Sequence, residues 1–415
     1  MQDFVKKHPI HTIILLVVIM LGLSIDNLEV TIMEARNFIT AREMSEDNNW
    51  LLTTMNGEPR YQKPPLPTWL TAISGMLFGF KNTLALRIPG IIMVAVTGIY
   101  SYLLSLKLVS NKEHAFINAL ITITSFYVIG IIIEAPWDIF THGFMLIGIL
   151  HLFMIFNGLG SKWKHSLIAG FCIGISILSK GPISFYALLL PFLIAYGITY
   201  KYQHIKSKWL SVVSIIVLAL IVGGWWYLYV KIEDPETFIK IASKETGNWG
   251  SYNVRPFYYY WSFFTQSGIW TIPAFIGLLY PYMKSRVSNI KAYRFSFFWT
   301  IIAVILLSII PEKKSRYLMP VLIPLAINTG FYIEYLFRKF KTLSDKREIL
   351  PVNFNFSLIS LIGLQFPITG YFLLKDELNS GWLQFAIASL LLFTIGILMF
   401  IALKRKLIDR AFYLT

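Results

Sequence analysis

The stretch NGEPRYQKPPLPTW, residues 56–69, interrupts a chain made mostly of apolar segments. It opens with an Asn-Gly turn and continues with three charged residues, three prolines within four positions and a tryptophan. Proline fixes the backbone angle φ, so this loop is expected to be rigid. A rigid basic loop near the beginning of an apolar chain indicates a role beyond connecting two helices.

The composition around this loop is that of an integral membrane protein. Of the 415 residues, 56% are hydrophobic and only 14% are charged, and the mean hydropathy is +0.61. Soluble domains carry about 25% charged residues. The single cysteine, Cys172, lies in an apolar run, which excludes disulfides within the chain and Cys-based metal sites. We therefore expect an all-α polytopic membrane protein.

Counting apolar runs of roughly 20 residues predicts about twelve transmembrane helices. They are expected near residues 10–27, 86–106, 115–133, 138–156, 166–179, 183–200, 209–230, 268–283, 295–310, 317–337, 355–373 and 383–403. The segment 66–80 is short, starts among prolines and contains two glycines. It is therefore expected to lie along the membrane interface.

The positive charges support this arrangement. If 66–80 does not span, one face holds 22 of the 37 Lys and Arg residues but only 6 of the 22 Asp and Glu residues. Short basic loops mark the cytoplasmic side, so both termini are expected in the cytoplasm. The net charge of +15 is then a topology signal, and nucleic-acid binding is not indicated.

The opposite, outer face carries two large loops, 28–85 and 231–267, and several candidate functional residues. In the first loop, TIMEARNFITAREM (31–44) places Glu34 and Arg36 directly after the first span. The alternative interpretation is a solvated interfacial helix with weak Glu/Arg pairs. Whether this segment is functional or only a solvated interfacial helix stays open at this point.

A second candidate is the turn IEAPWDIFTH (133–142), with Glu134, Asp138 and His142. Placing a carboxylate at membrane depth costs free energy, and carboxylates found there are usually functional. Asp138 could instead cap its helix, where the helix dipole favours a negative charge. His142 is either a hydrogen-bonded core histidine or, with Asp138, part of a metal site.

Basic residues also cluster on this face. Lys180 stands in the short turn SKGP (179–182), and Lys314 and Arg316 lie in PEKKSRYLMP (311–320). Such clusters suit an anionic ligand such as a phosphate. The alternative is anchoring to lipid headgroups. The second loop adds Glu245 among many aromatic residues.

Together these motifs resemble a known family. EARNFITAREM, NGEPRYQKPPLPTWL, ALRIPG (85–90), IEAPWD, LSKGP and KKSRYLMP follow the order and spacing of the GT-C glycosyltransferases. They are similar to the lipid A aminoarabinose transferase branch, which is related to protein O-mannosyltransferases. The resemblance covers residues 1 to about 340 and implies a catalytic transmembrane domain there, with 341–415 supplying a cytoplasmic loop and the last two helices. It also implies a bacterial cytoplasmic (inner) membrane protein.

The resemblance assigns roles to the candidate residues. The loop would lie over an outer-face cavity, with Lys63 at the phosphate of a polyprenyl-phosphate sugar donor. The expected phosphate-binding residues are Lys63, Arg60, Lys180, Lys314 and Arg316; the expected catalytic carboxylates are Glu34 and Asp138; and the expected supporting residues are Arg36, Tyr61, Glu134 and Glu245.

The sequence also departs from the family pattern. Met33 stands where the family has an aspartate, and Gln62 replaces an acid that can bind a metal. No cofactor is firmly implied, and a divalent metal held by Asp138 with His142 stays open.

The predicted function is inverting transfer of a hexose or pentose from a polyprenyl phosphate to a lipid, glycan or protein acceptor at the outer face. This would modify lipid A or another envelope glycan. The alternative is a polyprenyl-phosphate or lipid carrier without transferase chemistry, which the loss of two family acids favours. Polar groups concentrate at the outer face and not within the spans, which favours the enzyme.

Overall fold

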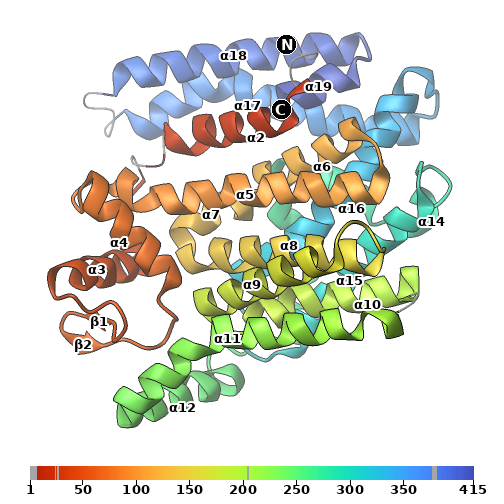
Figure 1. Ribbon diagram of the computed structural model, residues 1–415. Helices are drawn as coiled ribbons and strands as arrows, with labels where there is room; N and C mark the ends of the chain where they lie inside the picture. Colours follow the sequence, from red (N-terminus) through yellow and green to blue (C-terminus); the bar gives the residue numbers. More distant parts are fainter. Residues whose placement is uncertain (1–6, 24, 26–27, 203–204, 376–380) are drawn as a thin grey trace. The chain divides into compact units, whose positions relative to one another are not determined.

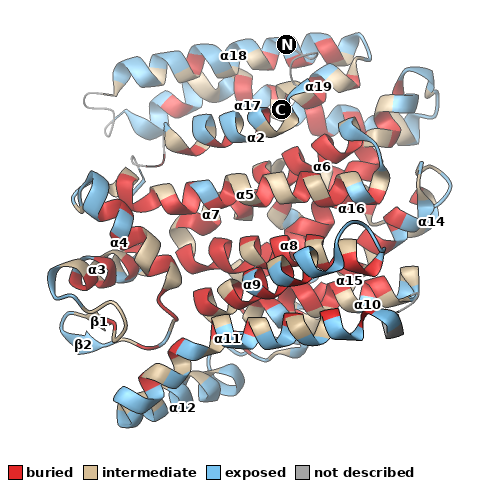
Figure 2. Cartoon of the chain, viewed as in Figure 1, coloured by how far each residue is buried: buried red, intermediate tan, exposed pale blue. Residues whose placement is uncertain are grey.

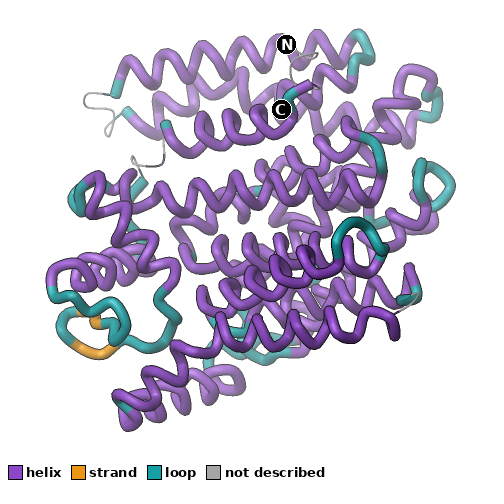
Figure 3. The backbone as a smooth tube through the Cα atoms, in the orientation of Figure 1, coloured by secondary structure: helices purple, strands orange, loops and turns teal. Residues whose placement is uncertain are grey.

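The computed structural model describes residues 7–23, 25, 28–202, 205–375 and 381–415 (Figure 1). Helices make up most of this part of the chain, and the β-strands among the described residues form one short antiparallel hairpin (Figure 3). The predicted all-α class is confirmed.

The helices and strands have the following bounds. The first half contains α2 (Pro9–Val17), η1 (Val18–Gly22), α3 (Ile32–Glu46), β1 (Thr54–Met55), β2 (Glu58–Pro59), α4 (Leu66–Phe78), α5 (Thr83–Val109), α6 (Lys112–Thr124), α7 (Phe126–Glu134), α8 (Pro136–Phe156), α9 (Lys162–Lys180), η3 (Phe185–Leu189), α10 (Leu190–Tyr200) and η4 (Ile205–Lys208). The second half contains α11 (Trp209–Glu233), α12 (Pro235–Ser251), η5 (Phe257–Tyr260), η6 (Phe263–Trp270), α13 (Thr271–Gly277), α14 (Tyr280–Met283), α15 (Ile290–Ile309), η7 (Ser315–Leu318), α16 (Met319–Lys339), η8 (Phe340–Thr342), α17 (Lys346–Leu374), α18 (Trp382–Lys404) and α19 (Ile408–Leu414).

The chain divides into two compact units. The first unit comprises Met1–Gly268 and Asn289–Gly330, and the second comprises Ile269–Ser288 and Phe331–Thr415. Every candidate site residue lies in the first unit. The expected division at residue 340 stays a prediction about function.

The first unit is a helical bundle. Helices α5, α8, α9 and α11 lie side by side in that order, and α8 is buried along most of its length (Figures 1 and 2). Glycines allow α9 and α11 to approach closely, because a Cβ at Gly223 would stand 2.8 Å from the carbonyl oxygen of Gly174. Small residues at helix crossings are typical of membrane bundles.

The second unit is built around a pair of long helices. Helices α17 and α18 pack at Gly363 and Gly396, and the Ser360 hydroxyl donates to the Gly396 carbonyl at 2.7 Å. Their remaining surface is rich in exposed Leu, Ile and Phe side chains (Figure 2). Exposed apolar helices of this length suit a lipid environment.

Most of the predicted spans correspond to a helix of the structure. Within the described residues, seven helices are long and apolar enough to cross a membrane, and the bent pair α6 and α7 makes eight. Helices 9–22 and 185–200 are apolar but shorter. The single helix expected at 268–283 is wrong. Gly268 has a positive φ of 66°, and the chain there forms the short pieces α13 and α14. Pro273 and Pro281 lie in the first turns of these pieces, where proline is tolerated because the backbone N–H has no partner within the helix.

Segment 66–80 forms α4, a helix of 13 residues. At 1.5 Å per residue it is about 20 Å long, which is less than the roughly 30 Å of a bilayer core. Its length agrees with the predicted non-spanning character, and its place at the interface stays a prediction.

Candidate functional site

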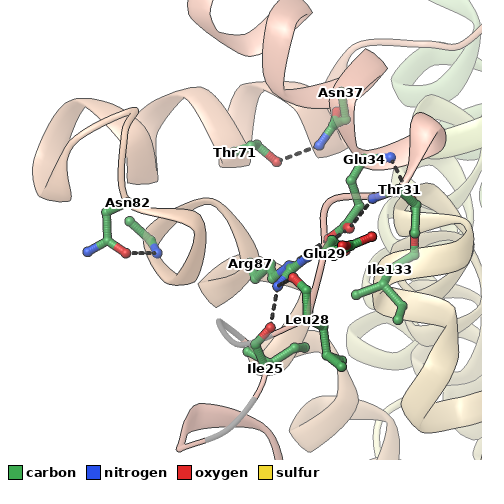
Figure 4. A network of polar contacts seen from close by, with 11 residues as sticks. Ile25, Leu28, Glu29, Thr31, Glu34, Asn37, Thr71, Asn82, Arg87 and Ile133 are labelled. Carbon is green, nitrogen blue, oxygen red and sulfur yellow. Dashed lines mark hydrogen bonds and ion pairs between the residues drawn. The ribbon is translucent and has the colours of Figure 1, made fainter. Parts of the chain in front are cut away.

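The first large loop, residues 28–85, is anchored by a buried ion pair between Glu34 and Arg87 (Figure 4). The Nε and Nη2 atoms of Arg87 lie 2.7 and 2.9 Å from the two carboxylate oxygens of Glu34, and both side chains are 1% exposed. Glu34 also closes a capping box with Thr31, whose backbone N–H donates to Oε2 at 3.1 Å. The carboxylate is therefore fully engaged within the protein.

Arg87 also ties down the chain that leads into α3. Its guanidinium donates to the backbone carbonyls of Ile25, Leu28 and Glu29 (Figure 4). The Thr31 hydroxyl meanwhile donates to the carbonyl of Ile133 at 2.6 Å, which connects α3 to the end of α7. Arg87 was not among the predicted site residues, although the motif ALRIPG contains it.

A second carboxylate, Glu43, holds the hairpin. Asn56 and Gly57 have φ of 56° and 77°, as a two-residue turn with left-handed central residues requires. Glu43 accepts from the Thr54 hydroxyl at 2.6 Å and from the N–H groups of Asn56 and Gly57 at 2.6 and 3.3 Å. Burial alone would raise the pKa of Glu43, but these hydrogen bonds, with a nearby arginine, hold it below its usual value. Glu43 was also missed by the sequence analysis.

The hairpin carries Arg60 toward α8. Its Nη1 donates to the carbonyl of Arg36 and to the Thr40 hydroxyl at 3.1 Å, and its guanidinium stands 5.4 Å from the centre of the Trp137 ring. Burial, with the nearby charge of Arg36, lowers the pKa of Arg60 to about 10. The structure thus gives Arg60 a role in joining α3, the hairpin and α8, while its predicted phosphate contact remains untested.

Tyr61 follows Arg60 and is buried. Its hydroxyl donates to Oδ2 of Asp234 at 3.1 Å, at the start of α12. Burial, together with this hydrogen bond, raises the pKa of Tyr61 to about 12. Tyr61 therefore links this loop to the second large loop, residues 231–267, and its supporting role stays a prediction.

Asp138 and Lys180 form the centre of the candidate site. Asp138 lies in the first turn of α8 and Lys180 is the last residue of α9, and their side chains, 2% and 9% exposed, form an ion pair. Lys180 lies 5.5 Å from the centre of the Tyr317 ring, and Lys63 and Arg316 are within electrostatic range of its ammonium group. Four residues predicted from separate motifs are thus brought together.

The ring of Tyr317 is shared by three cations. Lys180, Lys314 and Arg316 lie 5.5, 5.6 and 6.0 Å from its centre. The electron-rich face of an aromatic ring attracts cations at such distances. Tyr317 was not predicted as a site residue, and the motif KKSRYLMP was the only signal for it.

Glu134 faces Arg316. It lies within electrostatic range of Arg316 and Asp138 and forms a hydrogen bond with the hydroxyl of Tyr127. Tyr127 in turn forms a hydrogen bond with Ser315. Glu134 therefore belongs to the same cluster as Asp138, and its supporting role stays a prediction.

Lys63 and Arg36 stand at more accessible positions. Nζ of Lys63 lies 3.5 Å from Oε2 of Glu245, and the two side chains are 27% and 41% exposed. Glu245 lies on α12, a helix with no buried residue among those described. The exposed Arg36 contacts the sulfur of Met33 at 3.9 Å. Lys63 thus makes a weak ion pair with Glu245, which lies on an exposed helix.

The 311–316 turn is held to the second outer loop. Val254 forms an isolated β-bridge with Glu312, and Nζ of Lys313 donates to the carbonyls of Arg255 and Ile310 at 3.0 and 2.6 Å. Lys313 is buried, and burial lowers its pKa. Lys313 therefore fixes the turn that presents its neighbour Lys314.

Lys314 has partners different from those of Lys313. It pairs with Glu312 at 2.6 Å and lies 4.8 Å from the centre of the Tyr252 ring. The pair is partly exposed, with side chains 22% and 9% accessible. Lys314 therefore contributes to the cluster from its edge.

The residues present do not form a metal site of the usual kind. His142 is buried on α8, and its Nδ1 lacks a hydrogen-bond partner among the described residues. Asp138 is engaged with Lys180. Within the part of the chain that the structure describes, no group of three or more His, Cys, Asp or Glu side chains could hold a metal ion. A pair formed by Asp138 and His142 alone falls short of the three protein ligands typical of catalytic zinc.

Comparison with known proteins gives three similarities in sequence. Residues 62–227 match the family model of dolichyl-phosphate-mannose-protein mannosyltransferases. An uncharacterized protein of Aquifex aeolicus is 25% identical over 74% of this chain and 60% of its own length. The undecaprenyl phosphate-alpha-4-amino-4-deoxy-L-arabinose arabinosyl transferase of Photorhabdus laumondii is 23% identical over 71% of this chain and 53% of its own length. The chain thus spans little more than half the length of these curated relatives.

Solved structures agree with these similarities. ArnT from Cupriavidus metallidurans, solved bound to undecaprenyl phosphate, has a TM-score of 0.72 at 16% identity, covering 97% of this chain and 74% of ArnT. Its apo structure has a TM-score of 0.68. The predicted resemblance is confirmed: this membrane protein has the fold of ArnT and is similar in sequence to the aminoarabinose transferases.

Proposed function

We propose that the chain transfers a sugar, a pentose or a hexose, from a polyprenyl-phosphate donor to a lipid, glycan or protein acceptor. The reaction takes place at the outer face of a bacterial cytoplasmic membrane, with both termini in the cytoplasm. The observation that carries the proposal is the convergence of Lys63, Lys180 and Arg316 near Asp138. Such a cluster suits a phosphate, and a protein with the same fold was solved with undecaprenyl phosphate bound.

The three cations act on the leaving group. The acceptor oxygen forms a bond with the anomeric carbon while the bond from that carbon to the phosphate oxygen breaks, which inverts the configuration. Negative charge develops on the departing polyprenyl phosphate. Cations preplaced where charge develops give the largest single contribution in many enzymes. Lys63 contacts the phosphate after exchanging its weak contact with Glu245, and Lys180 and Arg316 complete the binding.

Asp138 acts on the acceptor. Its carboxylate orients an acceptor hydroxyl and takes its proton as the new bond forms, a role that contributes about 10²–10⁴-fold in rate. Glu34 acts differently, through its pair with Arg87, by fixing the first loop. Its carboxylate makes two hydrogen bonds with Arg87 and one with the Thr31 backbone, which leaves it poorly placed to accept a proton from a substrate.

The proposal is tested with the full-length protein in proteoliposomes. We expect wild type to transfer labelled sugar from undecaprenyl-phosphate 4-amino-4-deoxy-L-arabinose, the donor named for the relatives, or from another polyprenyl-phosphate sugar. Asp138→Asn and Lys63→Ala should lose transfer while Lys81→Ala, an exposed lysine of the same outer loop, retains it. If the donor binds through Lys63 but no sugar moves across a broad acceptor panel, the protein is a carrier and the transferase proposal is wrong.

A further inference from the structure

The second unit contains a basic region with two cavities, each of about 370 Å³, that share Arg286. Their lining comes from α13, α14, α16 and α17 and from the segments 284–288 and 340–346, and these two segments belong to the expected cytoplasmic face. The cations that line them are Arg286, Arg338, Lys339 and Arg347, and the lining carboxylates are Asp345 and Glu348. Cations therefore outnumber carboxylates around these cavities.

Arg286 is fixed in place at the junction. Its Nη2 donates to Glu348 at 2.6 Å, and its guanidinium carbon lies over the Tyr282 ring, 3.8 Å from the ring centre. The Tyr335 hydroxyl donates to the other oxygen of Glu348 at 2.8 Å. Glu348 is thus already satisfied by the protein, and the group around Arg286 forms a preorganised wall.

Two of the other cations are free to meet a ligand. Lys339 and Arg347 are exposed, and within the described residues neither side chain makes an ion pair. Arg347 lines the first cavity and Lys339 the second, and Arg286 lines both. Arg338 in contrast is paired with Glu334 at 2.5 Å. The unneutralised charge is therefore concentrated at Lys339 and Arg347.

The cavities are not purely polar. Ile276, Leu279 and Pro351 line the first, and Leu343 lines the second. A small soluble anion would leave these apolar surfaces in water, whereas a lipid would cover them with its glycerol and acyl region. The unit also exposes the apolar helices α17 and α18, as a lipid-embedded element does.

We propose that these two cavities bind the headgroup of an anionic phospholipid, with Lys339 and Arg347 attracting its negative charge from the two cavities and the apolar lining contacting the start of the acyl chains. Basic pockets next to membrane helices on the cytoplasmic side are suited to anionic headgroups. This site lies outside the proposed transfer site, and its ligand is a structural lipid and not a sugar donor.

The test uses the delipidated full-length protein in detergent, with binding followed by native mass spectrometry and by the thermal midpoint. Phosphatidylglycerol is expected to bind and to raise the midpoint, while phosphatidylcholine with the same acyl chains is not. Each cation near a membrane surface contributes about 1 kcal/mol, or roughly fivefold in affinity. Lys339→Gln with Arg347→Gln should therefore weaken phosphatidylglycerol binding by roughly 30-fold.

The matched control is Lys404→Gln with Arg405→Gln, two exposed cations of the same unit that line neither cavity. This variant should bind phosphatidylglycerol like wild type. Equal binding of the two lipids by wild type would overturn the proposal, as would equal loss in both double variants. If millimolar inorganic phosphate raises the midpoint as much as phosphatidylglycerol, the site takes a free anion and the lipid assignment is wrong.

Discussion

Replacing Arg87 by methionine should destabilise the protein severely by leaving Glu34 buried without its partner. Both side chains are 1% exposed, and Arg87 also satisfies three backbone carbonyls. Breaking a buried ion pair by removing one partner costs about 3–5 kcal/mol. In domains of 150–250 residues each kcal/mol shifts the thermal midpoint by about 2–4 °C, so Arg87→Met should lower it by roughly 6–20 °C.

The assay is a double-mutant cycle on purified protein, with thermal midpoint and sugar transfer measured on the same samples. Arg87→Met with Glu34→Gln should be less destabilised than the sum of the single variants, with a coupling of about 1–3 kcal/mol. The control is Arg42→Met on α3, whose pair with Glu46 at 3.6 Å is about half exposed. An exposed pair of this kind contributes about 0–1 kcal/mol.

Two results would refute this reasoning. An Arg87→Met variant as stable as Arg42→Met would show that the pair does not anchor the loop. A Glu34→Gln variant with an unchanged midpoint but no transfer would show that Glu34 takes part in the chemistry directly. In that case the sequence-based prediction of Glu34 as a catalytic carboxylate would stand.

Three further predictions concern the outer loops. Lys63→Ala should weaken donor binding while Glu245→Gln should strengthen it, measured by titration of a polyprenyl phosphate into purified protein; equal effects of Lys63→Ala and Lys81→Ala would contradict this. Because the folded-state pKa of Glu43 lies below its usual value of 4.5, its stabilisation of the hairpin is present above that pH and lost as the pH falls through the folded pKa. After correction for the intrinsic pH dependence of exchange, amide exchange at Asn56 and Gly57 should accelerate at low pH in wild type. In Glu43→Gln it should be fast at every pH. A cysteine at Glu58 should react with a membrane-impermeant reagent added outside intact spheroplasts, and one at Ser344 only after lysis; the reverse pattern would invert the topology.

The candidate residues that the structure brings together are those whose position follows from a turn. Asp138, Lys180 and Arg316 each stand at the outer end of a helix or in a turn, so a common sidedness places them at one face. Their closeness in space, seen in the pair Asp138–Lys180, is consistent with the motif order of the family. Helix ends and charge sidedness are local properties, which is why a single chain reveals them.

The residues that the sequence missed are partners across long separations. Arg87 lies 53 residues from Glu34, and nothing in the pattern of either segment indicates that one neutralises the other. Glu43 appeared to belong to a solvated Glu/Arg face, yet it holds the hairpin turn. The helix expected at 268–283 failed for a local reason, because hydropathy alone overlooked its glycine and prolines.

The pairing of the cations has a consequence for turnover. Lys63 faces Glu245, Lys180 faces Asp138 and Lys314 faces Glu312, and Glu134 lies within electrostatic range of Arg316, so each of these four cations already has a carboxylate nearby before any substrate arrives. An anion entering such a site competes with built-in counterions and gains less than it would from bare cations. The same competition speeds departure of the spent carrier, since each carboxylate recaptures its cation. Product inhibition by polyprenyl phosphate should therefore be modest, and it should deepen when Glu245 is neutralised.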